Sequence, residues 1–142
     1  MPSITIGVLF DGPEFGDVQE VAKVTINSLS LGSQSYTLTN TFQWFGPDVA
    51  VWSGPGTVTN LSPSTSGGGA VWRITNPFGS INDITSIQFT ALAGACGFGL
   101  CNNQSDFTLV QLKYEPIPEP GTYAMLGLGL IGLGLLARRR KA

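Results

Sequence analysis

The feature that most limits how this chain can fold is an uncharged stretch near its C-terminus, residues 121–137, with the sequence GTYAMLGLGLIGLGLLA. Pro116, Pro118 and Pro120 precede it, and proline fixes φ and removes a backbone donor, so no helix can run through them. As a helix the stretch would be about 25 Å long, slightly short of the bilayer's hydrocarbon thickness of about 30 Å, and the basic residues that follow it decide in favour of a membrane span. The sequence therefore predicts a single transmembrane helix over residues 121–137.

Four basic residues, Arg138, Arg139, Arg140 and Lys141, follow this apolar stretch directly. Basic residues next to a membrane span stay on the cytoplasmic side, so we expect this cluster to stop transfer and to leave the rest of the chain outside the cytoplasm. The preceding part of the chain carries three basic residues against all nine acidic ones, a net charge of −6, while the remainder carries +4. The overall net charge of −2 is therefore the sum of two unlike parts.

The composition excludes several classes of function. Because the chain contains no histidine, it has neither a Ser-His or Cys-His nucleophilic pair nor a histidine metal ligand. Three cations before the apolar stretch make no basic patch for phosphates, so we expect no nucleic-acid binding. The glycines at 67–69 lack the lysine and the strand-to-helix context of a phosphate-binding loop. We therefore predict that the protein is not an enzyme and has no catalytic residues, metal site or cofactor.

The tripeptide Pro118-Glu119-Pro120, the aromatic Tyr123, the Leu/Gly-rich stretch and the terminal Arg cluster together resemble a PEP-CTERM sorting signal. Signals of this family occur on exported and surface proteins of Gram-negative bacteria that make extracellular polysaccharide. The resemblance implies that an exosortase, a membrane-embedded processing enzyme, recognises the chain near this tripeptide and releases or transfers the part before it. It divides the chain into an exported body, residues 1–115, and a sorting signal, residues 116–142.

The resemblance also implies a location. The precursor would lie in the inner membrane with its body outside the cytoplasm, and the mature form would be at the cell surface or extracellular. Proteins of this kind normally begin with a secretory signal peptide, but here there is no basic opening region, and Asp11 follows the short apolar stretch at residues 4–10. We expect the true start to lie upstream of Met1.

The body has the alternation that is typical of half-buried β-strands. Around Tyr36 and Leu38, apolar residues share one parity while threonines fill the other. Val24 and Ile26 alternate in the same way, but Leu29 and Leu31 continue on the other parity, which predicts a bulge or a break. Further candidate strands are residues 4–10, 49–52, 57–61, 71–75, 85–92 and 107–114. Short strands separated by Gly/Pro/Ser turns predict an all-β body, an antiparallel β-sandwich.

Cys96 and Cys101 are the two cysteines of the chain, in the stretch CGFGLC. The glycines between them give the backbone freedom to close a short loop, and an exported protein reaches an oxidising compartment. We favour a disulfide between them over two free thiols. Two thiols without further ligands cannot complete a zinc site.

Aromatic and acidic residues allow two further readings. Trp44 and Trp72 lie on the apolar parity of their strands, which favours core packing, whereas Trp52 precedes a Ser-Gly-Pro turn and is the candidate for an exposed carbohydrate contact. Four carboxylates are spaced by three between residues 11 and 20, among glycines and a proline. A solvated acidic loop is the favoured interpretation, with calcium binding as the alternative.

These observations predict a structural or adhesive protein of the envelope or extracellular matrix, processed by an exosortase. Two alternatives stay open. One is a carbohydrate-binding module of the exopolysaccharide matrix, and the other is a single-pass envelope protein whose signal is never cut.

Overall fold

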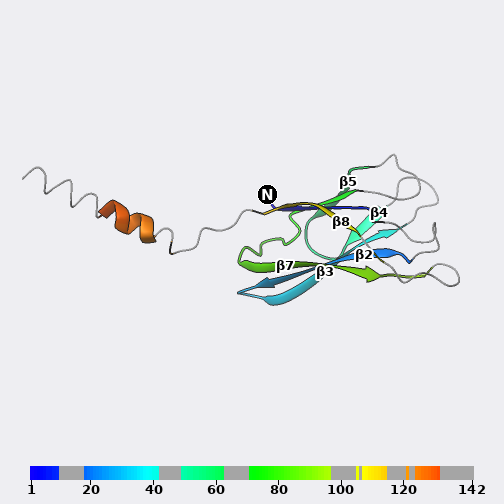
Figure 1. Cartoon of the computed structure of the whole chain (residues 1–142), viewed down its shortest axis with the longest axis horizontal. Coiled ribbons are helices and arrows are strands. Elements are labelled where there is room, and N and C mark those ends of the chain that lie inside the picture. The colour runs from blue at the N-terminus through cyan, green and yellow to red at the C-terminus, as the bar shows by residue number, and fades with distance from the viewer. Residues whose placement is uncertain are drawn as a thin grey trace, which may run out of the picture.

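The structure is a computed structural model of the chain, and it describes residues 1–9, 18–41, 49–62, 71–96, 105, 107–114, 121 and 124–131. Within these ranges, eight strands form two four-stranded antiparallel sheets (Figure 1). This architecture confirms the prediction of an all-β body with antiparallel sheets. The predicted transmembrane helix is taken up below with the site.

The first sheet has the strand order β5 (Thr57–Asn60), β6 (Trp72–Thr75), β1 (Ser3–Gly7), β8 (Thr108–Lys113). The second has the order β4 (Val49–Trp52), β3 (Gly32–Thr41), β2 (Glu20–Ser28), β7 (Ile84–Ala93). In the first sheet β1 lies between β6 and β8, which are both distant in sequence. In the second sheet β2, β3 and β4 follow one another along the chain, and β7 is the distant neighbour of β2.

The alternation in the sequence sets the two faces of each sheet. Along β2 the burial alternates, so that Ala22, Val24 and Ile26 are fully buried while Lys23 and Thr25 between them are partly exposed. In β1 and β6, Ile4, Ile6 and Ile74 are also fully buried. The core formed by such residues comprises Ile4, Ile6, Leu9, Ala22, Val24, Ile26, Leu38, Ala50, Trp72, Ile74 and Phe78.

One buried polar residue links the two sheets. Asn40, near the end of β3, is fully buried, and its Nδ2 donates a 3.1 Å hydrogen bond to the carbonyl of Leu9, which follows β1. Its own backbone carbonyl accepts a 2.6 Å bond from Nε2 of Gln19. Because buried polar groups are costly unless they are bonded, these contacts help to fix how the sheets face each other.

The change of parity at Leu29 is a break between two strands. β2 ends at Ser28 and β3 begins at Gly32, and the two strands pair as a hairpin in which Ser28 lies opposite Gly32. Gly32 has φ of +68°, a left-handed value that glycine adopts at no steric cost. The pairing of β2 with β7 also shifts register between Asn27 and Ser28, so a bulge accompanies the break.

The other predicted strands are found with small shifts at their ends. The strand predicted at residues 4–10 is shorter, since β1 ends at Gly7 and Val8 has φ of 58°, which an extended strand does not allow. β7 and β8 differ from the predicted ranges by one residue at each end. Residues 42–48, which include Trp44, lie outside the described residues.

Several chain segments meet at the end of the sandwich where β8 ends, which we call the exit end. Ser3 at the start of β1 pairs with both Thr75 at the end of β6 and Lys113 at the end of β8. The hairpin turn between β2 and β3 lies at this end too, because the backbone N–H of Leu29 donates to the carbonyl of Asp83, just before β7. In Figure 1 the N-terminus and this hairpin turn lie on the same side of the sandwich.

Candidate functional site

The described part of the predicted membrane segment is helical. Gly121 and residues 124–131 have helical conformation. Its large apolar side chains are 62% to 72% exposed, namely Met125, Leu126, Leu128, Leu130 and Ile131. A Cβ added at Gly127 or Gly129 would meet no atom within 4 Å. Because successive helical residues are rotated by about 100°, these side chains point to all sides, and a helix that is apolar all round requires an apolar environment.

Across the residues that the structure describes, we find no helix with the length and apolar character needed to span a membrane. The structure describes only part of the predicted span at residues 121–137. The tripeptide Pro118-Glu119-Pro120 lies outside the described residues, and so does the basic cluster Arg138, Arg139, Arg140 and Lys141. The roles of these residues therefore stay predictions.

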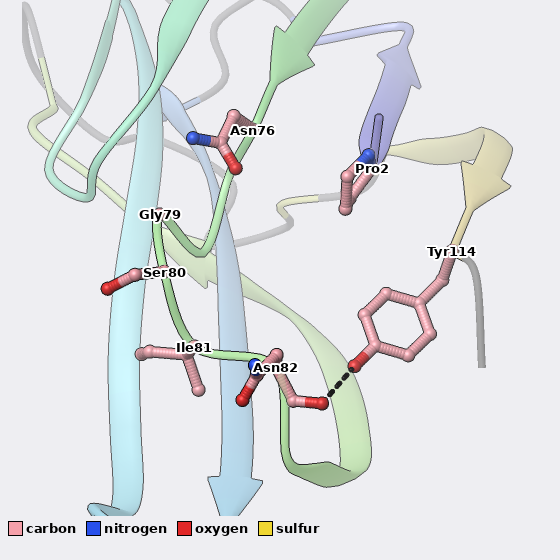
Figure 2. A pocket seen from close by; sticks show the side chains of 7 residues that line it. All are labelled: Pro2, Asn76, Gly79, Ser80, Ile81, Asn82 and Tyr114. Carbon is pink, nitrogen blue, oxygen red and sulfur yellow. Dashed lines mark hydrogen bonds between the residues drawn. The ribbon is translucent and has the colours of Figure 1, made fainter. Parts of the chain in front are cut away.

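The body is bonded to itself almost up to the start of the sorting signal. β8 ends at Lys113, and the hydroxyl of the next residue, Tyr114, donates a 3.4 Å hydrogen bond to the carbonyl of Asn82 (Figure 2). Asn76, at the start of the segment that leads to Asn82, donates its backbone N–H to the carbonyl of Pro2 at 2.9 Å. Tyr114 is the last residue of the body that the structure describes, one residue before the predicted limit of the body.

A hollow of about 300 Å³ lies at this point of the exit end. It is lined by Pro2, Asn76, Gly79, Ser80, Ile81, Asn82 and Tyr114 (Figure 2). Its lining carries no charged side chain, and the phenol ring of Tyr114 forms one wall. No local sequence pattern predicts this hollow, because its lining comes from three segments that are distant along the chain.

The two tryptophans that the structure describes, Trp52 and Trp72, differ in how deeply they are buried. Trp72 is 2% exposed and belongs to the core, as its parity predicted. Trp52 is half-buried against the core, 5.6 Å from Tyr36 between ring centroids, and its Nε1 donates a 2.9 Å bond to the carbonyl of Pro55. A carbohydrate contact at Trp52 stays a prediction, but the ring already packs against protein on one side.

The cysteine and acidic residues are only partly described. Cys96 is disulfide-bonded, whereas Cys101, its predicted partner, lies outside the described residues, so the pairing stays a prediction. Of the four spaced carboxylates, the structure describes Glu20, which is 2% exposed in β2. Because Glu20 is buried in a strand, it does not belong to a solvated acidic loop, contrary to the favoured interpretation of the four carboxylates. In the described ranges, no group of three or more Cys, Asp or Glu could hold a metal ion.

Comparison with known proteins identifies one part of the chain. The family model for the PEP-CTERM protein-sorting motif matches residues 116–141. We found no match to the chain among curated proteins or among solved structures. The match covers the signal and leaves the sandwich without an assigned relative. Residues 116–141 are thus a PEP-CTERM sorting motif, a signal for exosortase-dependent sorting to the cell envelope.

Proposed function

We propose that this chain is the precursor of a structural or adhesive protein of the cell surface or extracellular matrix. An exosortase recognises Pro118-Glu119-Pro120 and separates the sandwich from the residues that follow. The observation that carries this proposal is the sorting motif at residues 116–141, which begins two residues after Tyr114, the last residue of the folded β-sandwich that the structure describes. The enzyme would therefore meet its recognition sequence beside a compact body.

The membrane segment serves as a temporary anchor in this proposal. Residues 121–137 hold the precursor in the inner membrane, with the basic cluster at 138–141 on the cytoplasmic side and the body on the other side. The exposed apolar side chains of residues 124–131 support this role, because lipid would cover the surface that the protein leaves open.

The outer face of the second sheet supports a structural or adhesive role for the body. Most of its outward positions carry hydroxyl or amide groups, namely Thr25, Asn27, Ser33, Ser35, Thr37, Thr39, Thr41, Ser86, Gln88 and Thr90. The other outward positions are Lys23 and, towards one end of the face, the apolar residues Val21, Val49, Val51 and Leu92. Some of the hydroxyl and amide groups bond across strands, as between Thr25 and Ser35 at 2.9 Å and from Asn27 to Ser86 at 2.8 Å. Such a hydrated, hydroxyl-rich surface suits contact with a polysaccharide matrix better than chemical catalysis.

The same face supports the second candidate function, a carbohydrate-binding module. Hydroxyl and amide side chains in rows can exchange hydrogen bonds with sugar hydroxyls. Replacing Thr37 and Thr39 by Val would remove two such groups from the centre of the face while keeping side-chain shape. Reduced retention of this variant on the organism's polysaccharide would favour specific binding, and unchanged retention would favour a structural role without a sugar site.

The sorting proposal is tested by replacing Pro118, Glu119 and Pro120 together by alanine, with Pro116→Ala as the matched control outside the tripeptide. Cells that express the exosortase are separated into membrane, surface and medium fractions. We expect the wild type and Pro116→Ala to leave the membrane fraction and the triple variant to stay in it at full length. The proposal is overturned if all three proteins distribute alike, and a wild type kept at full length in the membrane would favour the uncleaved single-pass alternative.

A further inference from the structure

The turn between β2 and β3 carries two exposed leucines. Leu29, Ser30 and Leu31 form this turn, which we call the leucine tip. Leu29 is 81% exposed, the highest value of any large apolar side chain in the described part of the chain, and Leu31 is 57% exposed. Hairpin turns in water are usually built from Gly, Asn, Asp, Ser or Pro, so two leucines at a tip call for an explanation.

A continuous set of hydrogen bonds places the leucine tip near Tyr114, the last residue of the body that the structure describes. The Tyr114 hydroxyl bonds to the carbonyl of Asn82 at 3.4 Å. The next residue, Asp83, accepts a 3.2 Å bond from the N–H of Leu29 at its carbonyl and a 2.7 Å bond from the N–H of Ser30 at its Oδ2. The tip and Tyr114 therefore both lie at the exit end.

The length of chain between the body and the membrane segment keeps this end close to the bilayer. Seven residue steps separate Tyr114 from Gly121, and a fully extended chain covers at most about 3.6 Å per residue, which gives about 25 Å. If the membrane anchor begins at Gly121, the exit end therefore lies no more than about 25 Å from the lipid surface, a distance comparable with the diameter of a small domain. Leu61 lies next to Val71 at the far end of the sandwich, opposite the end where Thr75 and Lys113 lie.

We propose that the leucine tip enters the interface of the lipid bilayer while the precursor is anchored. The inference rests on the proposed function, because it requires residues 121–137 to be held in the membrane. Two leucines on a turn present the kind of apolar surface that the boundary between headgroups and acyl chains accepts. The contact would orient the sandwich, and with it the recognition tripeptide, relative to the membrane in which the exosortase is embedded.

The backbone of the leucine tip is already prepared for an environment without water. All three of its N–H groups are bonded within the protein: those of Leu29 and Ser30 to Asp83, and that of Leu31 to Oγ of Ser28 at 3.0 Å. The carbonyl of Leu31 accepts a 3.2 Å bond from Nε2 of Gln34. Unpaired backbone groups are the main obstacle to placing a loop in lipid, and these bonds lower that obstacle.

The contact is expected to be reversible. Even a single myristoyl chain, with more apolar surface than two leucines, gives only marginal membrane binding. A tethered tip, however, has a high effective concentration at the bilayer surface, so weak contacts are made while the tether is intact. Cleavage near Pro120 removes the tether, and the leucine tip alone does not hold the body on the membrane.

The test uses the full-length chain reconstituted in protein-free vesicles of phosphatidylethanolamine and phosphatidylglycerol. An environment-sensitive fluorophore is attached at Leu31→Cys, with Leu61→Cys as the matched control, since Leu61 is 41% exposed and lies at the far end. Peptide mapping checks that Cys96 keeps its disulfide and carries no label. We expect a blue shift at position 31 and quenching by lipid-borne quenchers, with emission at position 61 remaining as in water.

Flotation of the same samples separates the two claims. A precursor that does not float with the vesicles would overturn the proposed anchor and this inference together. A precursor that floats while position 31 emits as in water would overturn the inference alone. A label at position 29 repeats the measurement independently, and Leu29→Ser in the Leu31→Cys chain should reduce the blue shift without lowering the melting temperature, because Leu29 is almost fully exposed.

Discussion

Gly32 and Gly56 both have left-handed backbone conformations, but the structural requirement for glycine differs between them. Gly56 has φ of +99°, and a Cβ there would lie 2.3 Å from the backbone oxygen of Thr75 and 2.6 Å from that of Asn76. Gly32 has φ of +68°, but a Cβ there would meet nothing within 4 Å. The turn before β5 therefore requires glycine for space as well as for conformation, and the turn before β3 requires it for conformation alone.

These two positions give a paired prediction for stability. Gly32→Ala should cost about 1–2 kcal/mol, the usual penalty for a left-handed residue with a Cβ. Gly56→Ala should cost more than Gly32→Ala, because backbone atoms of the neighbouring segment must also move. Urea denaturation of both variants measures the difference. Equal losses would mean that the chain at Gly56 relaxes freely, contrary to the close approach seen here.

Trp52 has two contacts that its replacement by phenylalanine would separate. Its indole N–H bonds to the carbonyl of Pro55, and its ring lies against Tyr36. Trp52→Phe keeps an aromatic ring but removes the hydrogen bond, so we expect a loss of about 0.5–1.5 kcal/mol in the free energy of unfolding. Thermal melts of the two proteins check this. An unchanged melting temperature would show that the indole hydrogen bond does not stabilise the fold. Trp52 would then remain a candidate for a carbohydrate contact.

The face of the sheet on which Trp52 lies could not be predicted from its neighbours in the sequence. Its position before Ser-Gly-Pro suggested an exposed ring. In the structure, Trp52 pairs with Leu38 across β4 and β3, and Leu38 is fully buried, so Trp52 falls on the inward face at the edge of the core. The register between strands decides this face, and register depends on distant residues that a local pattern does not contain.

At the scale of elements, the strands could be predicted and their arrangement could not. Alternation located β2 and β3 because their inward residues, such as Val24, Ile26 and Leu38, are buried while their neighbours are more exposed. The sheet orders put β1 between β6 and β8, which are more than 60 residues away along the chain. Such neighbours are chosen by the packing of the whole core. The grouping of the leucine tip with Tyr114 was hidden for the same reason.

The sheet orders predict which strands open most readily. β1 and β2 each have a bonded neighbour on both sides, whereas β8 lies at an edge of its sheet and all six of its side chains are exposed. Hydrogen exchange detected by mass spectrometry should therefore show slow exchange in β1 and β2 and faster exchange in β8. Protection of β8 equal to that of β1 would contradict this order and would indicate that another strand covers its free edge.

At the scale of the whole molecule, the chain is an acidic sandwich joined to a short basic-ended signal. The signal was recognisable from the sequence because its parts follow one another within residues 116–141, without help from folding. The function of the body is harder to predict, since a β-sandwich supports many functions and its surface chemistry decides among them. Tyr114, whose hydroxyl bonds to the carbonyl of Asn82, is the last residue of the body that the structure describes, and the motif begins two residues further along the chain.

The central claim is that this sandwich is separated from its signal by an exosortase. The most direct measurement is the identity of the C-terminal residue, determined by mass spectrometry of the protein purified from cells with and without the exosortase. The account predicts that the protein ends near Pro120 when the enzyme is present and continues through Arg138, Arg139, Arg140 and Lys141 when it is absent. Chains that end at the same residue in both cells would contradict it.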